Sequence, residues 1–284
     1  MTIRPRKQFA QHWLRSDKAL SQIICAAELS KDCRVLEIGP GTGNLTRLLL
    51  ASAQSVVAVE IDQYLCEFLS QKFGQVENFL LLQADILSLN LNKALVPFST
   101  FQKLNKVVAN IPYNITGAIL EKLLGTISQP AAEPLDLIVL LVQKEVAARL
   151  CAQPGSKVYG ALSVRIQYLA ACEWICNVPA KAFYPVPKVD SAVVRLRPHS
   201  GSVDNRQTLS AQDPRCMDTL IKLGFATRRK MLRNNLKSYV NRDRLTHLLE
   251  QLGIDPQARA EDLSVPQWVA LSNLLTPTPC SPTL

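Results

Sequence analysis

The chain has 284 residues, of which 48% are hydrophobic and 19% are charged, and its formal net charge is +9. This composition excludes intrinsic disorder, collagen-like repeats and disulfide-dense miniproteins, and the length predicts one large or two modest domains. The longest apolar run, Leu137–Val142, has the length of a buried strand, whereas a membrane helix needs about 18 residues. We therefore expect a globular chain without a membrane segment.

Cysteine and histidine usage indicates a reduced, metal-free protein. The eight cysteines are scattered with no Cys-x-x-Cys pair, and none of the three histidines lies near such a pair. These cysteines are typical of small buried apolar residues rather than of disulfides or zinc ligands. The first seven residues are basic but lead into Gln, His and Trp rather than an apolar segment, so we expect no signal peptide and a cytoplasmic location.

The positive charge is concentrated in two segments. Residues 1–20 hold five Lys or Arg against one Asp, and residues 205–250 hold ten against four acidic residues, so the rest of the chain is close to neutral. Basic clusters gain affinity for polyanions by releasing counterions from phosphates, although a solvated protein face gives the same pattern. Nucleic acid is therefore the leading partner class.

Short apolar or β-branched segments alternate with helical stretches in the first half of the chain. The pattern predicts strands at Arg34–Ile38, Ser55–Glu60, Phe79–Gln83, Lys106–Ala109 and Leu135–Val142, and helices at about Asn44–Ala53, Gln63–Phe73 and Thr116–Ser128. Strands that are apolar on both faces belong in a parallel sheet covered by helices. The predicted fold class is α/β.

The second half of the chain changes character near residue 198. Cys172–Val178 and Ala192–Leu196 are predicted to be two further strands that complete the sheet, separated by a proline-punctuated segment. Polar residues dominate the stretch that follows, and leucines at helical spacing come after it. The predicted organisation is an α/β domain with a basic N-terminal arm over residues 1–198, a linker over 199–214 and a small all-helical domain over 215–284.

Three glycines, Gly39, Gly41 and Gly43, follow the first strand of the predicted sheet and open a helix. Glycine allows a tight turn and a close approach of a ligand to the backbone. The spacing is one residue shorter than the dinucleotide fingerprint, and the Lys-Ser/Thr of a phosphate loop is missing. The loop resembles a nucleoside site without a pyrophosphate, although on its own it could be only a structural turn.

Acidic residues stand at the ends of the next two strands. Glu60 lies 17 residues after Gly43, where a carboxylate in nucleotide-binding α/β folds can accept both ribose hydroxyls. Asp85 follows the third strand and could accept a hydrogen bond from an adenine amino group. Each acid alone is also a common cap or turn residue. Three such signals in order at strand ends favour S-adenosylmethionine as the ligand.

The tetrapeptide Asn110-Ile-Pro-Tyr113 comes directly after the fourth strand. Pro112 favours an extended conformation at the residue before it, which would leave backbone carbonyls pointing into a cleft. Asn110 adds a side-chain carbonyl and Tyr113 a flat ring, which together could hold an exocyclic amine and stack its base. An ordinary turn after a strand is the alternative interpretation. Behind a methyl-donor loop, the tetrapeptide predicts methyl transfer to a nucleobase amine.

These motifs resemble those of the ribosomal RNA adenine N6,N6-dimethyltransferases, and the resemblance extends over nearly the whole chain. The matching segments are Arg6–Leu14, Glu37–Gly41, Val59–Asp62, Ala84–Ile86, Asn110–Tyr113, Gln143–Val146, Tyr159–Ser163, Phe183–Ala192 and Arg228–Leu236. The resemblance implies a Rossmann-like class I S-adenosylmethionine-dependent methyltransferase sheet with a helical domain that grips rRNA. It also implies a monomer that acts on small-subunit rRNA in the immature small ribosomal subunit, without a metal.

The resemblance further implies roles for individual residues. The methyl donor would be held by His12, Leu14, Gly39, Glu60, Asp85 and Asn110. The catalytic group would be Asn110, Pro112, Tyr113 and Phe183, with Tyr113 on one face of the unstacked adenine and Phe183 a candidate for the other. RNA would contact Arg228, Arg229, Lys230 and Arg233, which on a helix would form a basic stripe.

Two segments depart from the family pattern. The family has Gln-Asn-Phe-Leu where this chain has Gln11-His12-Trp13-Leu14, and Gln where this chain has Thr227. His12 is the less secure donor ligand for that reason, and a surface histidine on a basic arm is the alternative.

The expected activity is dimethylation at N6 of two adjacent adenines near the 3′ end of small-subunit rRNA. Related enzymes modify one adenine of large-subunit rRNA and confer antibiotic resistance, and other relatives bind nucleic acid without catalysis. The long match at Phe183–Ala192 and the C-terminal domain favour the small-subunit substrate. The presence of both Asn110 and Tyr113 favours an enzyme.

Overall fold

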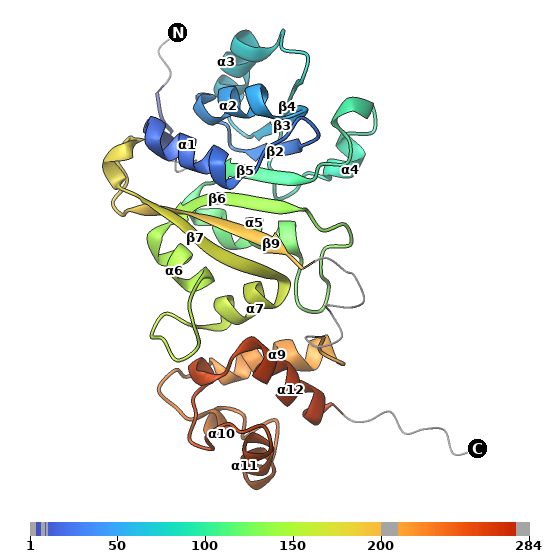
Figure 1. The fold of residues 1–284 in the computed structure, drawn as a ribbon, viewed down its shortest axis with the longest axis vertical. Coiled ribbons are helices and arrows are strands. Elements are labelled where there is room, and N and C mark those ends of the chain that lie inside the picture. Colours follow the sequence, from blue (N-terminus) through green and yellow to red (C-terminus); the bar gives the residue numbers. More distant parts are fainter. Residues whose placement is uncertain (1–3, 7–8, 10, 200–209, 277–284) are drawn as a thin grey trace, which may run out of the picture. The chain divides into compact units, whose positions relative to one another are not determined.

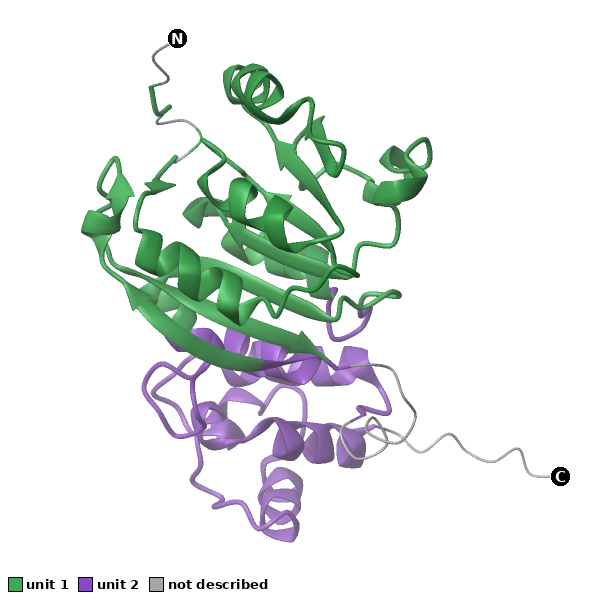
Figure 2. Ribbon diagram, turned by 45° about the horizontal axis from the view of Figure 1, so that its top comes forward, with its two compact units in different colours: residues 1–124, 131–147, 172–198 green, residues 125–130, 148–171, 199–284 purple. Residues whose placement is uncertain are grey.

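The computed structural model describes residues 4–6, 9, 11–199 and 210–276, and they divide into two compact units (Figure 2). Unit 1 comprises residues 1–124, 131–147 and 172–198, and unit 2 comprises residues 125–130, 148–171 and 199–284. Ten residues of the predicted linker, 200–209, lie outside the described residues. The domain boundaries drawn from the sequence stay a prediction.

Within the described residues, seven strands form one sheet in the order β4-β3-β2-β5-β6-β9-β7, and two short strands, β1 and β8, pair separately (Figure 1). The strands are β1 Trp13–Leu14, β2 Arg34–Ile38, β3 Ser55–Glu60, β4 Phe79–Gln83, β5 Lys106–Asn110, β6 Leu137–Gln143, β7 Ala170–Val178, β8 Phe183–Tyr184 and β9 Ser191–Pro198. Strands β2 to β6 pair in parallel with their neighbours, and β9 pairs with β6 in the antiparallel direction.

Helices connect and cover these strands. The α-helices are α1 Asp17–Ala26, α2 Asn44–Ser52, α3 Gln63–Phe73, α4 Leu91–Ala94, α5 Thr116–Leu124, α6 Lys144–Leu150, α7 Ala161–Leu169, α9 Pro214–Gly224, α10 Leu232–Asn235, α11 Arg242–Gln251 and α12 Val265–Leu275. The short 3-10 helices are η2 Ser99–Phe101, η3 Tyr113–Ile115, η4 Ala180–Ala182 and η5 Ala260–Asp262. None of the described helices is long and apolar enough to cross a membrane.

One strand of the sheet, β6, shows why the central strands are continuous apolar runs in the sequence. Alternate residues of β6, namely Leu137, Val139 and Leu141, belong to one buried cluster with residues of α1 and α2. Side chains of successive strand residues point to opposite faces, so Ile138 and Leu140 face the other side, and they too are fully buried. Both faces of β6 are therefore covered, as expected for a strand in the middle of an α/β sheet.

The predicted α/β fold class is confirmed, and most element bounds agree within two residues. The predicted helix from Thr116 ends earlier than expected, at Leu124 rather than Ser128, because Gly125 takes a positive φ of 78° and turns the chain. The parallel pairing expected for the five strands from Arg34 to Val142 is confirmed, and β9, whose direction the sequence pattern did not predict, runs antiparallel to β6. The sequence patterns also missed the β1–β8 pair, whose strands have two residues each.

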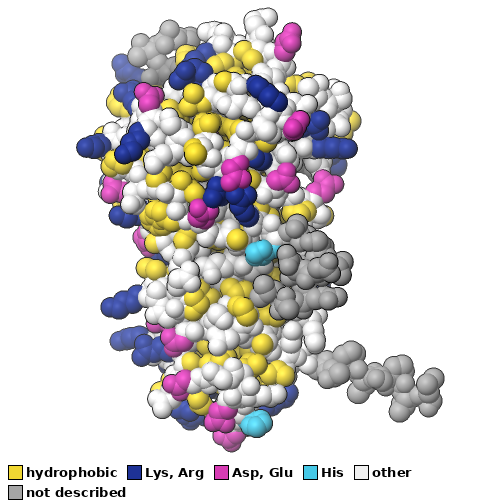
Figure 3. Space-filling view, viewed as in Figure 1, with side chains coloured by type: hydrophobic (Ala, Val, Ile, Leu, Met, Phe, Trp, Pro, Cys, Tyr) yellow, Lys and Arg dark blue, Asp and Glu magenta, His cyan; other side chains and the backbone are white. Residues whose placement is uncertain are grey.

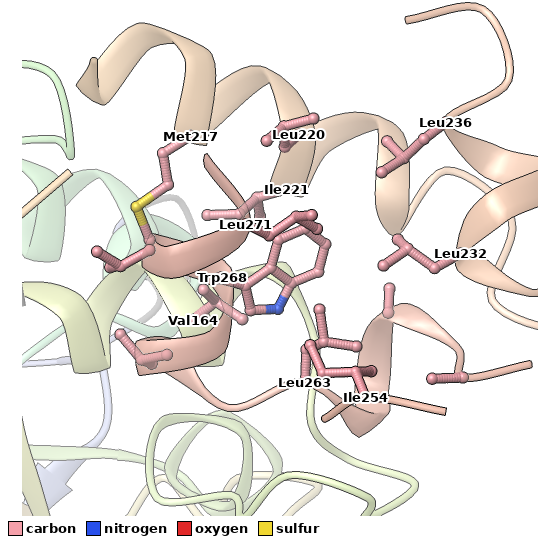
Figure 4. Packing of buried hydrophobic residues seen from close by; sticks show 14 of the residues in the cluster. Val164, Met217, Leu220, Ile221, Leu232, Leu236, Ile254, Leu263, Trp268 and Leu271 are labelled. Carbon is pink, nitrogen blue, oxygen red and sulfur yellow. The ribbon is translucent and has the colours of Figure 1, made fainter. Parts of the chain in front are cut away.

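Unit 2 is built around Trp268 of α12 (Figure 4). Its indole is fully buried among aliphatic side chains from several helices; those labelled in the figure include Val164, Leu220, Ile221 and Leu271. A Cβ atom at Gly224 would lie 2.6 Å from the Trp268 ring, so only glycine fits at this end of α9. Unit 2 thus has its own hydrophobic core, and residues from 125–130 and 148–171, which were expected in the α/β domain, contribute to it.

Candidate active site

A single pocket in unit 1 collects most of the residues that the sequence indicates. It lies at the carboxyl ends of the parallel strands, where ligands of open α/β sheets bind. Its walls come from the glycine loop after β2, the ends of β3 and β5, the loop after β4 and the segment that contains β1. The predicted site residues on these walls are His12, Leu14, Gly39, Glu60, Asp85, Asn110, Pro112 and Tyr113.

The glycine loop has a backbone conformation that residues with a Cβ atom adopt only with strain. Gly39, Gly41 and Gly43 all have positive φ, between 58° and 76°. A Cβ atom at Gly41 would lie 2.9 Å from the Trp13 ring, and one at Gly43 would lie 2.5 Å from Phe73. A Cβ atom at Gly39 would lie 3.9 Å from the Pro112 ring and 4.0 Å from the Asn110 carbonyl oxygen. The loop therefore brings the end of β2 against the end of β5.

Glu60 is the best-organised polar group of the pocket. Its side chain is 5% exposed, and it accepts hydrogen bonds from the backbone N–H groups of Ile61 and Asp62 at 3.0 Å each and of Gly41 at 3.3 Å. Burial raises the pKa of Glu60, while the three N–H groups act in the opposite direction by favouring the carboxylate. The carboxylate is thus fixed in position and able to accept hydroxyl groups.

Asp85 is placed differently from Glu60. It lies in the loop after β4, is exposed, and accepts a hydrogen bond through Oδ1 from the N–H of Leu87 at 2.9 Å. Asp85 therefore stabilises a turn, which was the alternative interpretation of this residue from the sequence. The residue also lines the pocket, so the two roles coexist.

The segment from Gln11 to Arg15 closes one side of the pocket as a strap. Its strand β1 pairs with β8, with Trp13 opposite Tyr184 and Leu14 opposite Phe183. Asn44 Nδ2 donates to the Leu14 carbonyl at 2.8 Å, and Asn110 Nδ2 donates to the His12 carbonyl at 3.0 Å. These amides hold the strap from the glycine-loop side and from the β5 side.

His12 is a wall of the pocket rather than a free surface histidine. Its Nδ1 lies 2.7 Å from the Pro185 carbonyl, so Nδ1 carries the hydrogen and a neutral ring keeps Nε2 as an acceptor. Its ring stacks on Tyr113 with 5.8 Å between ring centres and 18° between planes. In this structure the histidine at the family's Asn position contacts Asn110 through its backbone carbonyl and Tyr113 through its ring.

The tetrapeptide after β5 leaves a specific set of acceptors. Asn110 uses its Nδ2 for the His12 carbonyl, which leaves its Oδ1 for a ligand. The Pro112 carbonyl accepts from Ile115 N at 3.4 Å and from Thr116 Oγ1 at 3.4 Å, so it is occupied by the start of α5. The Tyr113 hydroxyl lies 2.6 Å from Ser191 Oγ of β9, which fixes the ring, and burial raises its pKa.

Glu37 is a polar residue of the pocket that lies in a segment matching the family but was assigned no role from the sequence. It lies in β2 and is 1% exposed, and its Oε2 has no hydrogen-bond partner within the described chain. Burial, together with the nearby Glu60 charge, raises the pKa of Glu37 to about 8. An acid between the apolar residues Leu36 and Ile38, just before a glycine loop, was the signal in the sequence.

Phe183 does not lie on the pocket wall. It is 3% exposed and packs in the cluster that contains Leu14 and Val193, opposite Leu14 in the β1–β8 pair. A ring so buried presents no free face to a base, so the position of Phe183 does not support the stacking role inferred from the sequence. Its neighbour Tyr184 is the exposed aromatic residue, at 45%.

The basic cluster in unit 2 is not the helical stripe that was expected. Residues 225–231 form a turn and α10 begins only at Leu232, so the helix-based spacing of Arg229 and Arg233 is wrong. Arg229 and Lys230 are exposed on this turn. Arg228 pairs with Glu261 at 2.8 Å, and Arg233 is half-buried with its Nε lacking a hydrogen-bond partner. Arg229 and Lys230, which are exposed and form no ion pair with a described residue, are therefore the two cations available to a polyanion.

The pocket fits S-adenosylmethionine by the chemistry of its donors and acceptors. Glu60 supplies a fixed carboxylate for hydroxyl groups, the glycine loop allows a close approach, and the unpartnered Oε2 of Glu37 and Nε1 of Trp13 are polar atoms on the walls. No group of three or more metal-ligating side chains occurs among residues 4–6, 9, 11–199 and 210–276. Fold and site together define a class I S-adenosylmethionine-dependent methyltransferase.

Comparisons with known proteins agree with this class. The family model described as "Ribosomal RNA adenine dimethylase" matches residues 3–277, and the chain belongs to this family. A relative from Nostoc punctiforme, named "Ribosomal RNA small subunit methyltransferase A", is 65% identical over 96% of each chain, and one of the same name from Synechocystis sp. is 56% identical over 100% of each. The family resemblance stated from the sequence is confirmed.

Two solved structures are similar over most of the chain. A dimethyladenosine transferase from Plasmodium falciparum has a TM-score of 0.75 and 26% identity, covering 92% of this chain and 96% of that one. The 23S rRNA methyltransferase ErmE has a TM-score of 0.73 and 28% identity, and the similarity covers 93% of this chain and 99% of that one.

Proposed function

We propose that this protein transfers methyl groups from S-adenosylmethionine to N6 of two adjacent adenines near the 3′ end of 16S rRNA, giving N6,N6-dimethyladenines during ribosome biogenesis. It would act in the cytoplasm as a monomer on the immature small subunit. The observation that carries this proposal is the Asn110 side chain, whose Oδ1 remains available in the same pocket as Glu60, with the stacked His12 and Tyr113 rings beside it.

When bound, S-adenosylmethionine supplies a methyl group activated by a sulfonium. Glu60 would hold the ribose hydroxyls and Asp85 the adenine amino group of the donor. Gly39 would let the donor approach the end of β5, and the strap with His12 and Leu14 would exclude water. Alignment of the reacting atoms can then supply most of the rate acceleration, since no strong base is required.

The target adenine would be held by the tetrapeptide after β5. Asn110 Oδ1 and the Ile111 carbonyl would accept the two N6 hydrogens, because the Pro112 carbonyl is already occupied by α5. Two acceptors favour a tetrahedral N6 whose lone pair is exposed to the methyl group. Tyr113, backed by His12, would stack on the base, and the N6 proton would leave to water after transfer.

The test is methyl incorporation from labelled S-adenosylmethionine into immature small subunits, followed by identification of N6,N6-dimethyladenine. The relatives' names favour the small subunit, while ErmE is named for 23S rRNA. Immature large subunits are therefore the second arm. Incorporation only into the large subunit would overturn the substrate, and incorporation into neither would favour the non-catalytic alternative.

A donor-binding test separates the site from the substrate. Glu60→Ala removes two ribose hydrogen bonds and leaves the Gly41 and Asp62 N–H groups without their acceptor. We expect a loss of about 1–3 kcal/mol in S-adenosylmethionine binding by calorimetry. Unchanged affinity in a folded Glu60→Ala protein would remove the ribose assignment.

A further inference from the structure

The rim beside the pocket carries an exposed aromatic and aliphatic surface that the proposed mechanism does not use. Tyr184 of β8 is 45% exposed, and in the segment that follows β8 Val186 is 63% exposed and Val189 46%. Arg15, at the end of the strap, is exposed as well. We call these four residues the aromatic rim.

The aromatic rim is connected directly to the pocket wall. Tyr184 pairs with Trp13 in the β1–β8 ladder, with their rings 6.3 Å apart, and Trp13 lines the pocket. The next residue, Pro185, accepts the hydrogen bond from His12, whose ring stacks on Tyr113. The wall formed by Trp13, His12 and Tyr113 is therefore continuous with the exposed Tyr184.

Arg15 and Tyr184 form a preorganised pair. The Arg15 guanidinium lies 4.2 Å from the centre of the Tyr184 ring, and the Arg15 backbone N–H donates to the Ala182 carbonyl at 2.8 Å. Among the carboxylates of the described residues, none forms an ion pair with Arg15, so its charge is not neutralised by the protein. An uncompensated guanidinium stacked on an exposed ring combines a phosphate-binding charge with a flat surface.

Single-stranded nucleic acids bind through this combination of cations and aromatic faces. We propose that Arg15 and Tyr184 form a stacking platform for the nucleotide next to the target adenine. This inference rests on the proposed function. One base would stack on the pair while its phosphate meets the Arg15 charge, and this contact would keep the neighbouring base unstacked and directed into the pocket.

The chain offers a matched control for this pair. Arg6 lies over the exposed Tyr64 ring of α3 at the same 4.2 Å, but Arg6 is also 3.6 Å from Asp62, so its charge is partly compensated. Tyr64 is 55% exposed and is not a wall of the pocket. Loss of Tyr64 therefore tests what removal of any exposed arginine–tyrosine pair does.

The experiment measures single-turnover methylation of immature small subunits over a range of subunit concentrations, with donor affinity by calorimetry as a check of folding. We expect Tyr184→Ala to raise the half-saturating subunit concentration about tenfold and Tyr184→Phe to stay within twofold of wild type, since stacking needs only the ring. Arg15→Gln should raise the half-saturating subunit concentration severalfold. Tyr64→Ala and the donor affinity of every variant should stay within twofold of wild type.

Wild-type half-saturation in Tyr184→Ala would overturn the platform, as would an equal loss in Tyr64→Ala. A parallel loss of donor affinity in Tyr184→Ala would also overturn it, because the β1–β8 pair would then act only by holding the strap. Wild-type protein that methylates no small subunit would refute the proposed function itself, which distinguishes the two failures.

Discussion

At the scale of single residues, the pocket contains polar side chains whose hydrogen bonds are made within the fold and others whose hydrogen bonds are not. Glu60 is bound by three backbone N–H groups, and Asn110 is anchored by one half of its amide. Glu37, in contrast, has an unpartnered buried oxygen. A buried polar group without a partner lowers stability, and such groups occur where a ligand completes them.

The destabilising effect of Glu37 should depend on pH. Its pKa is about 8 in the fold against an ordinary value of 4.5, so the protonated acid favours the fold below pH 4.5 and this stabilisation is lost as the pH rises toward 8. Glu37→Gln stays neutral, so its free energy of unfolding relative to wild type should increase by about 2–4 kcal/mol from pH 5 to pH 8. Denaturant unfolding at several pH values measures this, with the exposed Glu77→Gln as control. A pH-independent difference would contradict a raised pKa.

Tyr113 should matter for transfer more than for donor binding. Its ring stacks on His12 and its hydroxyl is fixed by Ser191. We expect Tyr113→Ala to slow methylation about a hundredfold or more with donor affinity within a few fold, because stacking is worth ~1–3 kcal/mol and misalignment adds to its loss. Tyr113→Phe keeps the ring and should lose far less. Donor binding and turnover that fall in parallel would place Tyr113 in the donor site instead.

At the scale of elements, two-residue strands position one wall of the pocket. The β1–β8 pair is too short to be stable by itself, and its stability comes from Leu14 and Phe183, which it buries in the main core. The Asn44 and Asn110 amides then fix the strap on the ligand side. A small sheet built on a large core thus carries His12 and the aromatic rim.

This arrangement predicts different roles for the adjacent aromatic residues of β8. Phe183→Ala removes a ring that is 3% exposed and should lower the free energy of unfolding by about 3–5 kcal/mol. Tyr184→Ala removes a half-exposed ring and should lower it by less than about 1 kcal/mol. Chemical denaturation of the two variants measures the contrast. Near-wild-type stability of Phe183→Ala would show that Phe183 is not a core residue.

At the scale of the whole molecule, one face shows positive charge in several places rather than on a single stripe (Figure 3). Lys and Arg side chains are spread over the face drawn in Figure 3, with Asp and Glu side chains between them. Several cations are paired within their own unit, such as Arg195 with Glu28 and Glu173, and Arg165 with Asp218. Paired cations contribute little to binding a polyanion, so the exposed, unpaired ones decide the salt dependence.

Arg229 and Lys230 are the members of the unit 2 cluster that should contact RNA. Their joint replacement by Gln should weaken binding to immature small subunits and flatten its salt dependence by roughly one unit of slope per lost phosphate contact, with donor affinity unchanged. Filter binding between about 50 and 200 mM salt measures the slope, with the exposed Lys93→Gln of unit 1 as control. A wild-type slope in the double variant would show that this turn does not touch RNA.

Local sequence patterns were enough to predict the α/β class, the bounds of β2 to β5 and of α2 and α3 to within one residue, and the line of polar residues at the strand ends, whereas α4 and η2 were missed. The family match confirms the class of enzyme. Strand periodicity, glycine spacing and the residues that end strands are all set by neighbours along the chain. These features are therefore visible before the chain folds.

The remaining features depend on which distant segments pack together. Phe183 and Tyr184 are both aromatic, and only the pairing of β8 with β1 shows that the first is buried and the second exposed. Packing between distant segments also decides three other features. These are the antiparallel direction of β9, the turn that interrupts the Arg228–Arg233 stripe, and the burial of Glu37 without a partner for its Oε2. Burial and register are properties of contacts between residues far apart in the chain, and a linear pattern does not contain them.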